Sequence, residues 1–227
     1  MLSFHLLVTS GAAALLVIAP ACGQAPARVR GTITAIDDAS ITVKERDGRI
    51  FVLKTGPYTA YAYVVPSSLD AIKVNDFVGI AVKGPLGSFV AVELAIIPED
   101  MQAGRISLYD WDPLPDPTAR HTSDRTATSM TNGLVSKISS GPVFTNTNMT
   151  NGIVSAEKVG AAGLTLTVTY DGGGKNFRIA VPPNAPIVRY VLSDRSAVAK
   201  GSAVMIKTNP GAQAGLVTVG KGVTPPM

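Results

Sequence analysis

The 227-residue chain contains very little cysteine and histidine. Cys22 is its single cysteine, and His5 and His121 are its two histidines. A disulfide needs two thiols, and zinc or copper sites are normally built from several His or Cys side chains. An intrachain disulfide and a conventional transition-metal site formed by one chain are therefore excluded. His121 is not accompanied by a nucleophile elbow, so the sequence indicates no catalytic residue.

Aromatic and charged residues are also scarce, at 6% and 16% of the chain. With 46% hydrophobic residues the chain is not of the disordered class, and its core must be built from Val, Ile, Leu and Ala. The formal net charge of +4 is only a mild basic bias. The few aromatics give no platform on which bases could stack, so we expect no nucleic-acid partner.

Long hydrophobic runs are missing after the first segment. The apolar run from Leu6 to Ile18 is short for a membrane span and is followed by small residues, which predicts a secretory signal peptide over residues 1–27. Cleavage after Ala27 gives a periplasmic or secreted protein, and attachment of lipid to Cys22 is the alternative. No later run is long enough to cross a bilayer, so no transmembrane span is expected after cleavage.

Two stretches of the chain have the same order of strand and turn signals. GTITAIDDASITVKERDGRIFVLKTG begins at Gly31, and GIVSAEKVGAAGLTLTVTYDGGGKNFRIAVPP begins at Gly152. In each, two alternating apolar runs flank an Asp-Gly pair, which predicts a β-hairpin. The DGGGKN segment is therefore a turn and not a phosphate loop, which would need Ser or Thr after Lys175 and a helix to follow.

Both stretches continue alike, through a short helix-like turn and two further strands. SSLDAIKVNDFVGIAV corresponds to SDRSAVAKGSAVMIKT, and FVAVELAII corresponds to GLVTVGK. Five short strands with one helical turn are typical of a small OB-like Greek-key barrel. The sequence thus predicts an all-β fold of two such barrels in tandem, joined by a long irregular connection. The boundaries are residues 28–97 for the first barrel, 98–129 for the Pro- and Asp-rich connection, and 130–227 for the second barrel with an extra N-terminal strand.

Two nearly identical segments, MTNGLVSKI from Met130 and MTNGIVSAE from Met149, precede the second barrel. One of them is its first strand and the other is the added strand. The sequence leaves open which is which.

Four aromatic residues are candidates for ligand binding. Trp111 is the only tryptophan and has Tyr109 beside it in the connection, while Tyr61 and Tyr63 have strand-like spacing. On an OB-like barrel such side chains could stack on a sugar or a base. Packing of the connection onto a barrel is the alternative.

Asp110, Asp112 and Asp116, with His121 nearby, are candidates for binding a hard cation such as calcium, which prefers oxygen ligands. Their spacing differs from that of a calcium-binding loop, and prolines intervene. Carboxylates exposed to solvent are the alternative, and no cofactor is predicted.

At the second repeat the sequence resembles a family of exported proteobacterial proteins of unknown function, often labelled "metal ABC transporter permease". The resemblance is carried by SMTNGLV, LTVTYDGG, VPPNAPIVRYVLSDRSAVAKGSAVMI and GKGVTPPM, and in the first repeat by RVRGTITAID, LDAIKVNDFVGIAV and VELAIIPEDMQAG. It covers nearly all of the chain after the signal peptide and implies two OB-like barrels.

The chain departs from that family at two places. Family members usually carry a histidine in the last strand of the first barrel, where this chain has Ala95. They also carry a Gly-His-Arg-Pro-Trp-Asp stretch, of which only Trp111 and Asp112 match here. If the family histidines bind metal, this chain lacks them.

The sequence therefore predicts an exported, non-enzymatic binding or structural protein of the periplasm or cell envelope. It does not identify the ligand, for which an envelope protein, a glycan and a small molecule are the candidates. Two alternatives remain open. One is an accessory protein in metal-ion handling. The other is an enzyme acting on envelope glycans, which would need two carboxylates facing one cleft.

Overall fold

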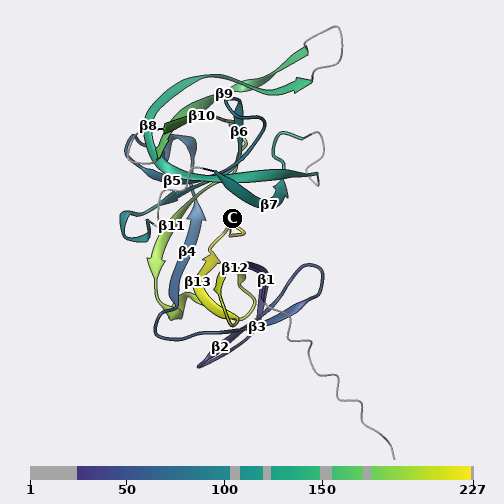
Figure 1. Cartoon of the computed structure of the whole chain (residues 1–227), viewed down its shortest axis with the longest axis vertical. Helices are drawn as coiled ribbons and strands as arrows, with labels where there is room; N and C mark the ends of the chain where they lie inside the picture. The colour runs from purple at the N-terminus through teal and green to yellow at the C-terminus, as the bar shows by residue number, and fades with distance from the viewer. Residues whose placement is uncertain (1–24, 103–107, 120–123, 149–154, 171–174, 226–227) are drawn as a thin grey trace, which may run out of the picture.

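The computed structural model describes residues 25–102, 108–119, 124–148, 155–170 and 175–225 (Figure 1). Strands make up most of these residues, and short 3-10 turns make up most of the remaining regular structure. The predicted all-β class is confirmed. The predicted signal peptide and Cys22 lie outside the described residues, apart from the last residues before the expected cleavage site.

Five strands form a closed β-barrel, which we call the upper barrel. They are β5 (Phe77–Lys83), β6 (Phe89–Ile97), β8 (Arg125–Asn148), β9 (Ser155–Tyr170) and β10 (Lys175–Val181). Their spatial order is β10-β9-β8-β5-β6, and a parallel pairing of β10 with β6 closes the circle. Closure hides the strand edges that an open sheet would expose.

A second set of five strands forms the lower ring. It consists of β1 (Arg28–Asp37), β2 (Ser40–Lys44), β3 (Ile50–Lys54), β12 (Ala203–Asn209) and β13 (Gln213–Gly220). The order is β13-β12-β1-β2-β3, and the parallel pair Gln213–Lys54 joins its two ends. The ring therefore closes at one residue pair only.

Each of these units takes strands from both halves of the chain. Two strands, β4 (Ala60–Pro66) and β11 (Ile187–Ser193), run between the lobes and pair antiparallel with each other (Figure 1). After β4 the chain enters the upper barrel as β5 and β6, and after β11 it enters the lower ring as β12 and β13. The observed grouping thus differs from the predicted barrels of residues 28–97 and 130–227. Hairpin and turn signals are local, and they do not specify which of two similar sets of strands a distant pair joins.

The connection between the predicted barrels is not irregular throughout. Strand β7 (Tyr109–Pro115) pairs antiparallel with the first part of β8, with a register shift between Trp111 and Leu114. Its prolines argued against a strand in the sequence. Among the described strands β7 pairs with β8 alone, so it is an edge strand, and an edge strand tolerates proline. Residues 103–107 and 120–123 of the connection lie outside the described part.

The structure places MTNGLVSKI in β8, where Phe77–Val82 pair with Leu134–Ser129. MTNGIVSAE falls mostly on residues 149–154, outside the described part, and only its last residues belong to β9. The first segment is therefore the strand that joins the upper barrel. A methyl group at Gly133 in this strand would lie 2.8 Å from a Val168 side-chain carbon and closer still to the Thr169 carbonyl, so the backbones pack tightly here.

The cores are aliphatic, as the composition predicts. Val78, Ile80, Leu94, Leu166 and Ile179 belong to the buried cluster of the upper barrel. A separate cluster fills the lower ring, and a third, between the two, combines residues of β4, β5, β6, β7, β8 and β11. The third cluster therefore packs the strands between the two lobes, in addition to the pairing of β4 with β11.

Within the part of the chain that the structure describes, no helix has the length and apolar character needed to cross a membrane.

Candidate functional site

Strand β7 brings the sequence-predicted residues Trp111 and Asp112 against β1 of the lower ring. The Arg28 guanidinium lies over the Trp111 ring, 3.9 Å from its centroid, as a cation–π contact. Arg28 also donates two hydrogen bonds to Asp112, from Nε to Oδ2 at 3.0 Å and from the terminal nitrogen to Oδ1 at 3.1 Å. Arg30 forms a further ion pair with Asp112. We call Arg28, Arg30, Trp111 and Asp112 the junction cluster.

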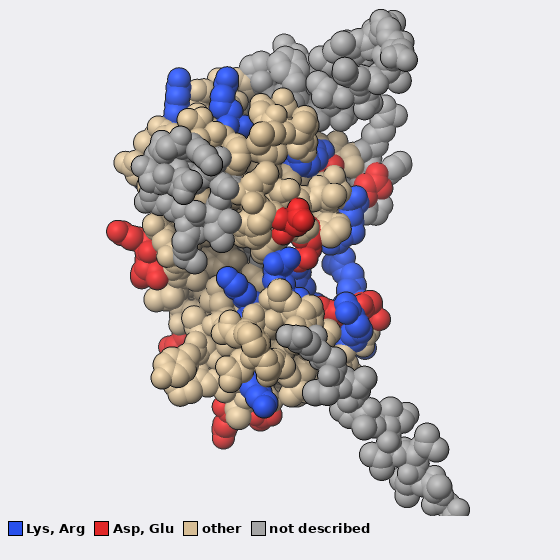
Figure 2. Space-filling view, viewed as in Figure 1, with Lys and Arg blue, Asp and Glu red and all other residues tan. Residues whose placement is uncertain are grey.

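The two guanidinium groups stabilise the ionised form of Asp112. Hydrogen bonds from Arg28 and Arg30 lower its pKa to about 2, although partial burial acts in the opposite direction. The carboxylate is therefore charged at neutral pH and already bound by two cations. Figure 2 shows side chains of both signs gathered where the upper and lower lobes meet.

Two tyrosines, half-buried Tyr109 and buried Tyr190, belong to the apolar cluster between the lobes. The Tyr109 ring meets the Trp111 ring edge to face at 5.7 Å, and burial raises the Tyr109 pKa. Burial also raises the pKa of Tyr190 to about 12. These groups stay neutral at physiological pH and fill the interface between the lobes.

A second ion pair fixes the end of β7. Asp116 and Lys83 are both largely buried, with Nζ and Oδ2 2.6 Å apart. The other Asp116 oxygen accepts from the Thr118 backbone N–H at 2.9 Å and from its hydroxyl at 2.8 Å. The hydrogen bonds and the Lys83 charge outweigh burial and lower the Asp116 pKa. Asp116 therefore ties β7 to β5.

The structure does not gather the predicted cation ligands. Asp112 and Asp116 belong to separate ion pairs, and Asp110 is exposed. Among the described residues no three His, Cys, Asp or Glu side chains lie close enough together to hold a metal ion. His121 lies outside the described residues.

The other predicted aromatic residues pack in the lower lobe. Tyr61 and Tyr63 share one face of β4 and contact the core of the lower ring. The Lys221 ammonium lies 3.5 Å from the Tyr63 ring centroid, and Arg195 donates to the Tyr61 hydroxyl at 3.3 Å. Tyr109 and Trp111 are likewise engaged with each other and with Arg28. All four aromatic side chains that the sequence offered for ligand binding are therefore in contact with other protein side chains.

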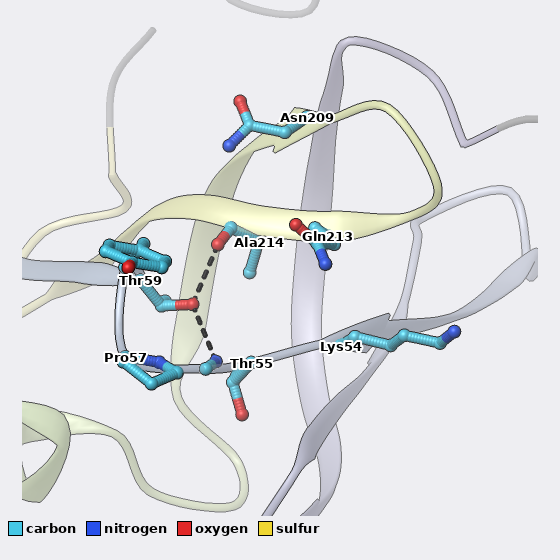
Figure 3. Close-up of a pocket in the computed structure, with 9 residues that line it drawn as sticks. Lys54, Thr55, Pro57, Thr59, Asn209, Gln213 and Ala214 are labelled. Carbon is cyan, nitrogen blue, oxygen red and sulfur yellow. Dashed lines mark hydrogen bonds between the residues drawn. The ribbon is translucent and has the colours of Figure 1, made fainter.

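A small recess lies where β3 meets β13 (Figure 3). Its volume is about 100 Å³, and Lys54, Asn209 and Gln213 contribute polar side chains to its lining. The Thr59 hydroxyl accepts from the Gly56 N–H at 3.0 Å and donates to the Ala214 carbonyl at 2.9 Å, as the dashed lines of Figure 3 show. The threonine is therefore part of the loop's own hydrogen bonding, and the recess suits little more than a few waters.

A larger recess lies on the outer face of the upper barrel, across β8, β9 and β10. Its volume is about 330 Å³. We call it the basic groove, and its lining consists of Lys137, Ser139, Thr165, Thr167, Asn176 and Arg178. Strand pairing brings these residues together, because Thr167 of β9 is the partner of both Lys137 on β8 and Arg178 on β10.

The alternation of the three strands points these polar side chains outward. Leu166, Val168 and Ile179 between them are fully buried in the barrel core. Among the residues that the structure describes, neither Lys137 nor Arg178 has a carboxylate partner. The groove is thus lined by two unpaired cations with hydroxyl and amide groups between them.

Sequence reasoning missed this groove. The signal was present in the alternation of ISS, LTLTV and NFRIAV, which predicts the outward set of each strand. What the sequence does not contain is the register that aligns Lys137, Thr167 and Arg178 in one row.

Searches of protein-family models, curated proteins and solved structures give no match to this chain.

Proposed function

We propose that this protein is an exported, non-enzymatic binding protein of the cell envelope and that the basic groove is its ligand surface. The observation that carries the proposal is the groove itself, a recess of about 330 Å³ with polar side chains from three adjacent strands. This volume lies at the lower end of the range of small-ligand sites, roughly 300–1,000 Å³.

The chemistry of the groove favours binding over catalysis. Four of its six lining side chains are hydroxyl or amide groups, which donate and accept hydrogen bonds at neutral pH without changing their protonation state. The other two, Lys137 and Arg178, are cations. General acid–base catalysis needs a group whose pKa lies near the working pH, such as histidine or a perturbed carboxylate. The residues that the structure describes in the groove lining include no such residue type.

The strand order of each unit supports the further proposal that both are OB-like. In the lower ring β1, β2 and β3 are followed around the circle by β13 and β12, with β13 parallel to β3. In the upper barrel β8, β9 and β10 are followed by β6 and β5, with β6 parallel to β10. OB-fold barrels bind oligosaccharides and oligonucleotides on the face of their second and third strands. In the upper barrel that face corresponds to β9 and β10.

A role in metal-ion handling finds less support. Asp112 and Asp116, the strongest candidates from the sequence, already bind cationic side chains. A metal ion would have to displace Arg28 or Lys83 from them.

The test is a ligand screen with the full chain, recovered after export, against envelope glycans, lipids and peptides. In the variant Thr167→Trp a bulky ring fills the groove at its centre. Thr42→Trp is the matched control, because Thr42 lies in the middle strand β2 of the lower ring. We expect at least one ligand class to bind the wild type and the Thr42→Trp variant, and to lose binding to the Thr167→Trp variant.

Two results would contradict the proposed function. One is chemical turnover of the bound ligand by the wild-type protein. The other is binding that Thr167→Trp leaves unchanged.

A further inference from the structure

The geometry points to an anionic polysaccharide, carrying carboxylate or phosphate groups, as the ligand of the basic groove. This inference deepens the proposed function and rests on it. It names the chemical class that the groove would select.

The first step concerns the placement of the two cations. Lys137 and Arg178 both pair with Thr167, so they lie in one row across three strands. Adjacent strands are about 4.8 Å apart, which places the two Cα atoms about 10 Å from each other. Both side chains are exposed on the outer face. An anionic group bound above Thr167 is therefore within reach of a lysine on one side and an arginine on the other.

The second step concerns charge. The groove lining contains no acidic side chain, and Lys137 and Arg178 have no carboxylate partner in the described part of the chain. The Cα atoms of the two cations are about 10 Å apart, which is comparable to the Debye length of about 8 Å at physiological ionic strength, so their repulsion is only partly screened. A bound anion relieves this repulsion and gains charge-assisted hydrogen bonds, which the arginine can make in pairs to carboxylate or phosphate.

The third step separates a glycan from other polyanions. Nucleic-acid grooves without sequence preference combine cations with aromatic side chains on which bases stack, and no aromatic residue occurs among the described residues that line the groove. These described residues also include no large apolar side chain that could form a pocket for a peptide anchor. Ser139, Thr165, Thr167 and Asn176 instead offer hydroxyl and amide groups, which match the hydroxyl groups of a sugar.

The experiment measures binding to the full chain by calorimetry with four probes: oligogalacturonate, a phosphorylated mannan, neutral dextran and a single-stranded oligonucleotide. We expect binding of the carboxylated glycan, the phosphorylated glycan or both, and none of dextran. Comparison of the carboxylated and the phosphorylated probe shows whether the groove prefers carboxylate or phosphate. Raising the salt concentration should weaken binding, because salt screens the attraction between the exposed cations and the anionic glycan.

Two double variants test whether the glycan binds at the basic groove. Replacing both Lys137 and Arg178 by serine should weaken anionic glycan binding by about tenfold for each cation removed. Lys44→Ser with Lys54→Ser is the control, because it removes the same charge from exposed positions on β2 and β3. The control should bind as the wild type does, and unchanged thermal unfolding confirms that both variants are folded.

The outcomes are distinguishable. Dextran binding that equals anionic glycan binding and is blocked by Thr167→Trp overturns the anionic class and leaves the proposed function standing. Binding of the oligonucleotide alone overturns the glycan assignment. Equal losses in the two double variants overturn the site, and failure of all ligands in this assay and in the broader screen overturns the proposed function as well.

Discussion

The junction cluster and the basic groove each hold two cations close together, but their surroundings differ. Arg28 and Arg30 converge on the carboxylate of Asp112 and lie against Trp111. Lys137 and Arg178 line the basic groove together with hydroxyl and amide side chains, as far as the structure describes it. In the described part of the chain, cations at the junction of the two lobes form ion pairs with a carboxylate, whereas Lys137 and Arg178 on the outer sheet face form none.

The difference has an energetic meaning. Removing one member of a buried, hydrogen-bonded ion pair is costly because the other charge remains without a partner. Removing a cation that has no partner costs little and can relieve repulsion. Stability measurements therefore test whether the two regions differ as the geometry indicates.

The largest effect is expected at the more buried ion pair. Asp116→Asn leaves the Lys83 ammonium partly buried and uncompensated, and we expect the free energy of unfolding to fall by about 2–4 kcal/mol. Urea denaturation should show a lower midpoint with an unchanged slope. Asp110→Asn is the control on the same strand and should change stability by less than about 0.5 kcal/mol, because Asp110 is exposed. Equal effects in the two variants would show that Lys83 does not depend on Asp116.

The sheet beneath the groove depends on close backbone contact. Gly133→Ala places a methyl group against the Thr169 carbonyl and the Val168 side chain, so we expect a loss of about 1–3 kcal/mol. Gly141→Ala on the same strand meets no atom within 4 Å and is the control. Thermal unfolding of both variants measures the difference. A Gly133→Ala protein as stable as the control would contradict the packing described for β8 and β9.

At the junction the expected loss is smaller, because Asp112 is 38% exposed and solvent screens its interactions. We expect Asp112→Asn to lower the free energy of unfolding by about 1–2 kcal/mol near neutral pH. The folded pKa of about 2 lies below the ordinary value of 3.8, so the stabilisation is present above pH 4 and lost as the pH falls toward 2.

Denaturant midpoints of the wild type and Asp112→Asn, measured between pH 7 and pH 2, check this pH dependence. The two proteins should differ at neutral pH and converge between about pH 4 and pH 2. A difference that stays constant down to pH 2 would show that Asp112 acts through packing and not through its charge.

The smallest effect is expected in the groove. Lys137→Ser and Arg178→Ser, alone or together, should leave the free energy of unfolding within about 0.5 kcal/mol of the wild type. Urea denaturation at low and at moderate salt measures this change in the free energy of unfolding. A slightly higher stability of the variants at low salt would reflect relief of the repulsion between the two cations. A loss comparable to that of Asp112→Asn would show that these cations have structural partners, and the contrast between the two regions would fail.

Much of the local structure could be predicted from the sequence. The alternation around Leu166 predicts an inward and an outward face, and both are observed. The Asp47-Gly48 turn joins β2 and β3, with Gly48 at a φ of 91°, as the hairpin signal predicts. The second Asp-Gly turn lies outside the described residues, but the strands on either side of it, β9 and β10, pair antiparallel. Such features depend on neighbours in the sequence.

The remaining features depend on residues far apart in the sequence. Arg28 and Asp112 are 84 positions apart, and nothing near either residue identifies the other as its partner. The carboxylates that looked like a cation site are therefore held by cations from other strands. The same holds for the groove, whose row of residues exists only once β8, β9 and β10 are in register.

The crossing of β4 and β11 between the lobes has a consequence for how the chain acquires its structure. Arg28 of β1 pairs with Lys207 of β12, and β12 pairs with β13, so the lower ring cannot close until both of these late strands have been made. Such distant contacts slow folding, because a long loop must be ordered before its ends meet. Neither half of the chain alone contains a complete circle of strands, so a fragment ending before β12 would leave β1, β2 and β3 with open edges. Newly synthesised chains would then be prone to pair with one another at these edges until their own C-terminal strands arrive.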